Sequence, residues 1–516
     1  MTVLGSLASF AHRRIAPLLT PYHHRRHQHT LKRGRVRRAD LERAAASWWG
    51  GDPRWFPGST PPRRHNRVTP LVDGECFLGD LHAALARAEH YVYIAGWCLT
   101  PDLPLRRTRR QDLVDTRLVE LLRDTAKRVP VRILLWGGAV AVIHPTRGEM
   151  LDVVRAFEGQ ADGDLVCRLD HTAHFSHCHH QKAIVVDGQV AFVGGMDLTT
   201  FQGDRWDLPG HALRSGPNWH DVQLRLEGEV VADVEHNFRQ RWQDSCRNCY
   251  PAAVPELLPA QAPRVDAAWH TAAQVVRTIP HDTYASVRRG EFGIYHSYLN
   301  AFRRAKRFIY IENQYLWSPH VMDVLIEQVQ RRRETPFRIV IVLPAGAHSG
   351  KWDNDRHVDT LRAVDDGRGI VSVYAPYASG PSAGVHAFRY RPVYVHAKVA
   401  IVDDEWLSVG SANLNNRGLI TDSEINVVVS DREIAVNLRI DLWAEHLAAP
   451  REQVAQADPI ALIDQLWRDR AAENASIQRR EDRGDRPLIG DVHAYVSGRL
   501  PASWFLDEAE ALTFEH

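Results

Sequence analysis

The chain contains 516 residues, of which 44% are hydrophobic and 25% are charged, as in ordinary globular proteins. Lysine and arginine residues number 64 and acidic residues 63. This balance does not fit the strongly basic surface of a dedicated nucleic-acid-binding protein, so nucleic acid is not an expected partner. No run of about 18 apolar residues occurs, so no transmembrane helix is expected.

Residues 1–67 are expected to form a basic N-terminal extension, because residues 1–40 are rich in lysine and arginine and contain one acid, Asp40. Such a segment is attracted to anionic lipid head groups, and it is equally compatible with a solvated arm. The six cysteines show no disulfide-framework spacing, which favours a reducing compartment. We therefore expect a cytoplasmic monomer that contacts a phospholipid surface peripherally, at the inner face of the cell membrane.

Residues 68–250 are predicted to form a first α/β lobe. The apolar run 91–97 predicts a buried strand, residues 113–127 a helix, and residues 131–136 a second strand. Strands that alternate with helices indicate an α/β fold whose sheet is covered on both faces.

The same order of elements recurs over residues 276–450, which are predicted to form a second, similar lobe. Its strand, helix and second strand are expected at 308–315, 320–333 and 338–343. The Pro- and Ala-rich stretch within 251–275 is typical of a linker. Residues 451–516 form a charged, partly helical tail. Internal duplication therefore organises the chain.

Each lobe contains one copy of the pattern H-x-K-x4-D. The repeated residues are His180, Lys182 and Asp187 in the first lobe and His396, Lys398 and Asp403 in the second. The flanking residues are apolar and β-branched, so each motif is predicted to lie on a strand. Alternation along a strand places the histidine and lysine of each motif on one face. The two aspartates have the opposite parity and precede turns, which favours a structural role for them.

Two histidines and two lysines that meet at a lobe interface suit a phosphodiester. The lysines can neutralise the phosphate oxygens. A neutral imidazole can attack phosphorus while a protonated one donates to the leaving oxygen. This chemistry needs no metal and no cofactor. A zinc site at the histidine- and cysteine-rich run 171–180 with Cys246 and Cys249 is the weaker interpretation, because His180 already serves the reaction.

Residues after each motif are expected to complete the site. Ser411 and Asn413, in a turn after the second motif, could present a hydroxyl and an amide to phosphate oxygens. Asp207 and Glu424 follow their respective histidines at nearly equal distances along the chain. They are therefore predicted to orient the imidazoles through the second ring nitrogen.

Over residues 68–450 the chain resembles the phospholipase D superfamily, whose signature is the paired H-x-K-x4-D. The resemblance extends to segments typical of the phospholipid-cleaving branch, namely 93–97, 179–182, 193–198, 205–207, 219–222, 289–291, 311–315 and 422–426. It implies two α/β lobes related by a pseudo-twofold axis, with the active site at their interface.

The resemblance also implies a metal-independent reaction through a phosphohistidine, with His180 as nucleophile and His396 as general acid and then base. The first lobe departs from the family's Gly-Ser-x-Asn pattern in having Gly194-Gly195-Met196-Asp197. Gly195 and Asp197 are accordingly the expected substrate contacts in the first lobe, beside Ser411 and Asn413 in the second.

The expected function is hydrolysis of glycerophospholipids to phosphatidate and a free head group. An alcohol acceptor in place of water would give a phosphatidyltransferase like the cardiolipin synthases. A nuclease of the same superfamily and a catalytically silent lipid-binding scaffold are the remaining alternatives. The even charge balance argues against the nuclease, and the two intact motifs argue against the scaffold.

Overall fold

The computed structural model describes residues 52, 54–107, 114–139, 144–159, 162–173, 177–245, 255–346, 351–381, 388–479 and 487–497. The chain separates into two units, Met1–Pro53 and Arg54–His516, and every element described below belongs to the second unit. Most of the predicted basic extension, as well as Cys246 and Cys249, lies outside the described residues.

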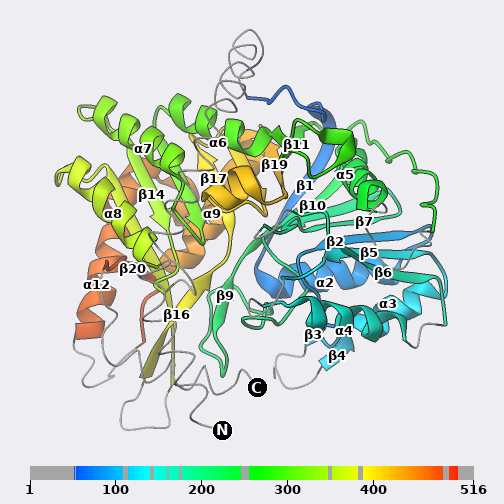
Figure 1. Ribbon diagram of the computed structural model, residues 1–516. Helices are drawn as coiled ribbons and strands as arrows, with labels where there is room; N and C mark the ends of the chain where they lie inside the picture. Colours follow the sequence, from blue (N-terminus) through cyan, green and yellow to red (C-terminus); the bar gives the residue numbers. More distant parts are fainter. Residues whose placement is uncertain are drawn as a thin grey trace. The chain divides into compact units, whose positions relative to one another are not determined.

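The first lobe alternates strands and helices as predicted, and the expected strands 91–97 and 131–136 correspond to β2 and β5 (Figure 1). The expected helix 113–127 corresponds to α3 only from Leu118, because residues 114–117 form the strand β4. The elements of this lobe are β1 (Arg63–Val72), α2 (Asp73–Ala86), β2 (Val92–Gly96), β3 (Pro104–Arg107), β4 (Val114–Arg117), α3 (Leu118–Ala126), β5 (Val131–Trp136), α4 (Arg147–Glu158), β6 (Leu165–Asp170), β7 (Ala183–Val186), β8 (Val190–Gly194), β9 (Asn218–His220), β10 (Val222–Gly228) and α5 (Val231–Ser245).

The second lobe repeats this order, and its predicted strand, helix and strand correspond to β13, α7 and β14. Its elements are β11 (Thr271–Ile279), a 3-10 turn (Ala285–Val287), β12 (Glu291–Phe292), α6 (Gly293–Arg304), β13 (Phe308–Asn313), α7 (Pro319–Arg331), β14 (Arg338–Val342), α8 (Lys351–Asp365), β15 (Val371–Pro381), β16 (Phe388–Val395), β17 (Lys398–Val402), β18 (Trp406–Gly410), a π-helical turn (Arg417–Thr421), β19 (Glu424–Val429) and α9 (Arg432–Leu447).

Both lobes contribute to one continuous sheet in which the strand order of one half repeats in the other. The first half runs β6-β5-β2-β7-β8-β10-β1. The second runs β15-β14-β13-β17-β18-β19-β11. Strands β1 and β11 pair antiparallel and join the halves. The predicted duplicated α/β fold, with its pseudo-twofold relation between lobes, is therefore confirmed.

The sheet is covered on both faces, which explains why its central strands are apolar throughout. All residues of β2 and β13 are buried. Helices α2 and α3 pack on one face of the first lobe and α6 and α7 on one face of the second, each pair with a core of its own. Helices α5 and α9 contribute to a third core that contains strands of both lobes. The lobes thus share part of their interior.

The predicted tail, 451–516, is part of the second lobe wherever it is described. It contains α10 (Arg451–Gln456), α11 (Pro459–Leu462), a π-helical segment (Ile463–Trp467), α12 (Arg468–Arg479) and β20 (Val492–Ala494). Strand β20 pairs with β15, and Trp467 lies in the shared core. At the other predicted boundaries, β1 begins within the expected extension and β11 within the expected linker, 251–275.

No helix among the described residues combines the length and the apolar composition that crossing a bilayer requires.

We predict that Trp467→Ala destabilises the protein by about 3–5 kcal/mol, because it removes a large buried ring and leaves a cavity. The Trp467 ring lies 4.9 Å from that of Tyr374 and 5.7 Å from that of Trp443, centroid to centroid. The midpoint of urea unfolding, followed by fluorescence, measures the change. Leu258→Ala, at a side chain that is 40% exposed, is the control and should shift the midpoint little. Equal shifts for both variants would contradict the packing of the tail.

Candidate active site at the lobe interface

The sequence pattern places both motif histidines within strands, whereas in the structure each lies two or three residues before the strand of its motif. His180 precedes β7 and His396 precedes β17. The backbone of each instead pairs with the opposite lobe: N of His180 donates to O of Ser423 (2.9 Å), and N of His396 donates to O of His220 (2.8 Å). Each histidine is therefore anchored on the other half of the molecule.

Nδ1 of each imidazole faces a buried carboxylate that also comes from the other half. His180 Nδ1 lies 2.9 Å from Oε1 of Glu424, and His396 Nδ1 lies 2.7 Å from Oδ2 of Asp221. Each carboxylate directly follows the residue that anchors the histidine backbone. A carboxylate on Nδ1 fixes the orientation of the ring and leaves Nε2 for chemistry. The predicted orienting role of Glu424 thus has the required geometry.

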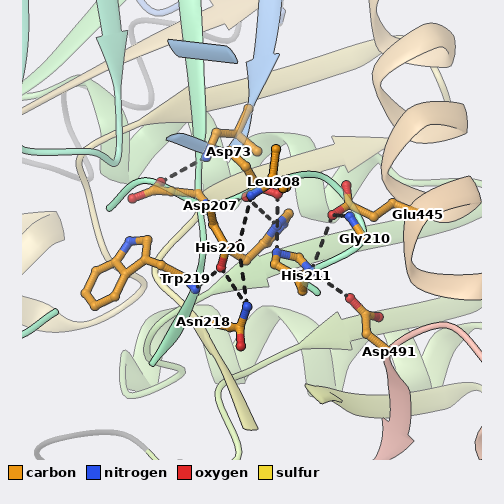
Figure 2. Close-up of polar contacts among 12 residues, drawn as sticks. Asp73, Asp207, Leu208, Gly210, His211, Asn218, Trp219, His220, Glu445 and Asp491 are labelled. Atoms are coloured by element: carbon orange, nitrogen blue, oxygen red, sulfur yellow. Dashed lines mark hydrogen bonds and ion pairs between the residues drawn. The ribbon is translucent and has the colours of Figure 1, made fainter. Parts of the chain in front are cut away.

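The corresponding prediction for Asp207 is wrong. Its carboxylate accepts hydrogen bonds from N of Trp219 (2.7 Å), Nδ2 of Asn218 (3.1 Å) and N of Leu208 (2.9 Å), and Figure 2 shows it among these groups. Asp207 therefore fixes the start of β9, while Asp221 takes the position beside the imidazole of His396.

The error comes from unequal loops. The connection between β8 and β10, residues 195–221, is longer than the equivalent connection between β18 and β19, residues 411–423. Equal distances from the histidines therefore do not identify equivalent positions. Asp221 stands directly before β10 and Glu424 is the first residue of β19. An alignment by strands, together with the segment 219–222, would have identified Asp221.

The motif lysines are buried beside the histidines. Lys182 Nζ donates to O of His180 (2.9 Å) and forms an ion pair of 2.7 Å with Oδ2 of Asp197. Lys398 Nζ donates to O of His396, and the two groups lie in short contact. Each lysine is thus held by the backbone of its own motif histidine, so two cationic groups face the same interface.

The residues predicted to bind substrate support the catalytic groups. Ser411 Oγ donates to the carboxylate of Glu424, and Asp197 pairs with Lys182. Nδ2 of Asn413 donates to Oε1 of Gln314 at 3.3 Å. Direct contact of these residues with substrate stays a prediction.

Gly195 has a steric role. A Cβ at this position would lie 2.1 Å from Oδ1 of Asp221. Only glycine therefore allows the Asp221 carboxylate to approach. The predicted contact of Gly195 with substrate remains a prediction as well.

Asp187 and Asp403 hold the ends of neighbouring strands, in agreement with the role predicted from their parity. Both have left-handed backbone conformations, with φ of 57° and 55°. Each carboxylate accepts hydrogen bonds of 2.7–2.9 Å from three consecutive backbone N–H groups. The donors are Glu89, His90 and Tyr91 for Asp187, and Lys306, Arg307 and Phe308 for Asp403.

The backbone and carboxylate contacts exchanged between the halves bring both motifs to one interface, and there the charges of both lysines affect both histidines. Burial, followed by Lys182, lowers the pKa of His180 well below its ordinary value, and Lys398 contributes in the same direction. Burial, followed by Lys398 and Arg205, lowers the pKa of His396 well below its ordinary value. Without an anion these shifts favour neutral imidazoles, whereas a phosphodiester anion between them would favour the protonated form that a general acid needs, because an opposite charge nearby stabilises the imidazolium.

Burial also shifts the groups around the histidines. It raises the pKa of Asp221 to about 6 and that of Glu424 well above its ordinary value. It lowers the pKa of Lys398 to about 7. A phosphate anion in the site would favour the charged form of this lysine, because an opposite charge nearby stabilises the ammonium group.

Aromatic rings line the histidines, and one arginine was missed by sequence reasoning. The ring of Trp97 lies 6.3 Å from that of His180, and the ring of Trp219 lies 5.1 Å from that of His396. The guanidinium of Arg205 stacks 3.7 Å above the Trp219 ring. Arg205 is a third cation near His396, and its place in segment 205–207 was the available signal.

The zinc alternative at run 171–180 falls partly outside the described residues, since His174, Cys246 and Cys249 are not among them. His179 is buried between carboxylate and hydroxyl partners, with Nε2 at 3.1 Å from Oδ1 of Asp170 and Nδ1 at 2.7 Å from Oγ of Ser423. Within the catalytic groups themselves, imidazoles and ammonium groups suit an anion.

The fold and the site define a class of two-lobed α/β proteins in which paired H-x-K motifs meet at the lobe interface. The sequence model of the family described as Phospholipase D matches residues 84–218 and 212–323. The model described as Cardiolipin synthase, PLD-like domain matches residues 298–444. The chain belongs to the phospholipase D superfamily.

Curated relatives agree with this assignment. Phospholipase D alpha 4 of Arabidopsis thaliana is 26% identical over 74% of this chain and 66% of its own length. Phospholipase D alpha 1 of Carica papaya is 26% identical over 75% of this chain and 66% of its own length. The chain thus spans slightly less than two thirds of these relatives. The crystal structure of phosphatidylserine synthase from Haemophilus influenzae Rd KW20 has the same fold, with a TM-score of 0.51 at 12% identity over 82% of this chain and 97% of that one.

We predict that Lys182→Met lowers the free energy of unfolding by about 3–5 kcal/mol, because it leaves the buried carboxylate of Asp197 without its cation. The two side chains are 2% and 4% exposed. Thermal unfolding measures the loss. The double variant Lys182→Met/Asp197→Leu should recover most of it. Lys127→Met, which breaks an ion pair between side chains that are 50% and 73% exposed, is the control and should have little effect. Equal stability of Lys182→Met and the wild type would contradict a buried pair.

Proposed function

We propose that the protein is a phospholipase D-type phosphodiesterase that hydrolyses glycerophospholipids to phosphatidate and a free head group. The observation that carries this proposal is the reciprocal pair of imidazoles, each held through Nδ1 by a buried carboxylate of the opposite half and each beside a buried lysine. The named relatives are phospholipases D, which supports the choice of a phospholipid substrate.

In the first step, Nε2 of His180 attacks phosphorus and a P–N bond forms. The P–O bond to the head group breaks, and protonated His396 donates its proton to the leaving oxygen. Lys182 and Lys398 compensate the charge on the non-bridging oxygens. The products are a phosphatidyl-histidine and the free head-group alcohol.

In the second step, water takes the place of the departed alcohol. Neutral His396 accepts a proton from the water while its oxygen bonds to phosphorus, and the P–N bond to His180 breaks. Phosphatidate leaves and both imidazoles return to their starting states. An alcohol acceptor would follow the same path and give phosphatidyl transfer. The family model that matches residues 298–444 is described as a cardiolipin synthase domain, which supports this alternative acceptor.

The pKa values of the two carboxylates indicate which histidine is the acid and which is the nucleophile. A pKa of about 6 leaves Asp221 largely ionised at neutral pH, and an ionised carboxylate favours the imidazolium form of His396, the acid. The pKa of Glu424 is raised well above its ordinary value, so His180 receives less support for a positive charge and suits the role of nucleophile. The resemblance to the family gives the same order.

We further propose that the protein works as a monomer at a phospholipid surface, peripherally and from the cytoplasmic side. The basic composition of residues 1–40 supports the contact with a phospholipid surface, because basic segments are attracted to anionic lipid head groups. Membrane attachment is separable from chemistry, since a short-chain soluble phospholipid would not require it.

The test uses phosphatidylcholine vesicles and detects released choline and phosphatidate. We expect turnover by the wild type, and we expect phosphatidylethanol to appear at the expense of phosphatidate when ethanol is added, because an acceptor competes with water for a covalent intermediate. His180→Ala and His396→Ala should each lower turnover about 10³-fold or more.

His296→Gln, a substitution at a buried histidine in α6, is the control and should retain activity. Full activity in either active-site variant would exclude a shared site. Cleavage of plasmid DNA without turnover of lipid would favour the nuclease alternative.

We predict that Asp221→Asn lowers kcat about 10³–10⁴-fold while Asp207→Asn lowers it far less, because only Asp221 contacts a catalytic imidazole. Glu424→Gln should resemble Asp221→Asn. Kinetics with a soluble phosphodiester, together with thermal unfolding of each variant, separates a catalytic loss from a loss of stability. An equal loss of kcat in Asp207→Asn would contradict the assignment.

A further inference from the structure

The two halves of the candidate active site differ in their aromatic side chains. Three rings gather on the side of His180: Trp97, which directly follows β2, Trp136, the last residue of β5, and Phe201, in the connection between β8 and β9. The Trp97 ring lies 6.2 Å from that of Trp136, 5.7 Å from that of Phe201 and 6.3 Å from that of His180, centroid to centroid. Trp97 therefore joins the other two rings to the proposed nucleophile.

These rings are large apolar surfaces that folding does not bury completely. Each of the three is partly exposed. Trp97 packs against the core of the first lobe, whereas Trp136 and Phe201 are not among the side chains of the three cores that the described residues form. Neighbouring exposed rings beside a catalytic group are typical of a binding surface.

Backbone hydrogen bonds fix two of the rings to residues of the site. N of Trp97 donates to Oδ1 of Asp197 (2.9 Å), and Oδ2 of the same carboxylate pairs with Lys182. O of Phe201 accepts a hydrogen bond from Nη2 of Arg205 (2.6 Å). The aromatic surface is thus tied to the groups that surround the phosphate.

The second lobe carries no ring at the equivalent positions. When the motif histidines are aligned, the pairing of β2 with β7 and of β13 with β17 makes Trp97 equivalent to Gln314. The registers of β5 and β14 make Trp136 equivalent to the buried Pro344. Phe201 lies in the connection that is longer in the first lobe. Groups that the chemistry needs twice are duplicated, so a feature of one half serves a part of the substrate that occurs once.

The rings on the side of His396 are buried and capped by polar groups. Trp219 is 1% exposed and Tyr394 is 7% exposed. The guanidinium of Arg205 lies 3.7 Å above the Trp219 ring, and the hydroxyl of Tyr394 accepts a hydrogen bond from Nε2 of Gln314 (2.7 Å). Little apolar surface thus remains on this side for an acyl chain.

The direction of the proposed reaction assigns each side to one part of the substrate. In an in-line displacement the entering nitrogen and the leaving oxygen lie on opposite sides of phosphorus. With His180 as nucleophile and His396 as acid, the head group lies beside His396. The diacylglycerol oxygen stays bonded to phosphorus beside the new P–N bond, so it is the substituent that groups flanking His180 can contact.

Building on the proposed function, we propose that Trp97, Trp136 and Phe201 bind the glycerol backbone and the first acyl methylene groups of the phospholipid. Burial of methylene groups against aromatic rings is favourable and non-directional. The surface therefore selects the part of the substrate that remains on the enzyme after the first step.

Aromatic rings also bind quaternary ammonium groups. A choline on this surface would have to leave from the nucleophile's side of phosphorus, which an in-line displacement does not allow. The rings beside His180 are thus assigned to the acyl part and not to the head group.

The test compares phosphatidylcholines that differ only in acyl length, each below the concentration at which it forms micelles. For the wild type, kcat/KM should be at least about tenfold higher with the dihexanoyl than with the dibutyroyl lipid, because each buried methylene contributes a factor of about four. In Phe201→Ser and in Trp136→Ser this ratio should fall below about threefold, because the apolar contact is lost. Trp97→Gln, which introduces the residue of the second lobe, should behave likewise.

The ratio of two substrates on one preparation does not depend on the fraction of folded protein, so a variant of low stability is still informative. Trp269→Ser, at a partly exposed tryptophan directly before the start of β11, is the matched control and should keep the wild-type ratio.

A ratio near one in the wild type, or a ratio that the three variants leave unchanged, would overturn the proposal while the proposed function stands. A loss that follows the head group, measured with dihexanoylphosphatidylglycerol against dihexanoylphosphatidylcholine, would also overturn it, since the rings would then contact the leaving alcohol. No turnover of any of these lipids by the wild type would contradict the proposed function, and the acyl-binding surface with it.

Discussion

The exchange of carboxylates across the lobe interface is the interaction on which the candidate active site depends. Glu424 of the second lobe orients His180 of the first, and Asp221 of the first orients His396 of the second. Neither half therefore contains both the histidine and the carboxylate of a catalytic pair. A relative shift of the lobes by about an ångström would disturb both pairs at once, and displacements of that size are costly for catalysis. The rest of the fold is arranged so that such a shift is resisted, through the β1–β11 pair, the core shared by both lobes and the burial of Trp467 from the C-terminal region.

Much of this arrangement can be predicted from the sequence, because the same order of strands, helices and motif residues occurs in both halves of the chain. Comparison of the two copies predicts the main strands, helices and motif residues of both lobes, and the parity of Asp187 and Asp403 separates their structural role from that of the histidines. The prediction of the site is wrong where the two copies differ in loop length. Asp207 follows His180 at nearly the distance at which Glu424 follows His396, but loops of unequal length make such distances poor guides. Strand ends keep their place in a sheet, so Asp221 is found by the strand that it precedes.

Other features could not be predicted because they depend on contacts between distant segments. The pairing of His180 with the segment before Glu424 displaced the histidine from its predicted strand. Trp97, Trp136 and Phe201 come from three separate segments with no common sequence spacing, so only the fold reveals that their rings meet. The same holds for the C-terminal region: its charged composition suggested a tail, whereas β20 pairs with β15 and Trp467 reaches the core.

The symmetric strand order has a consequence for the way the two copies can change. Two equivalent strands, β1 and β11, pair where the two halves meet. An isologous dimer has the same geometry, because each subunit contributes the same elements to its interface. In a dimer of identical chains every substitution occurs twice, so the nucleophilic histidine and the acidic histidine are surrounded by the same residues. Here both copies lie in one chain and are free to differ, as Asp221 differs from Glu424, and as Asp197 after β8 differs from Asn413 after β18. Covalent linkage of the halves thus permits a division of labour between two imidazoles that strict symmetry would forbid.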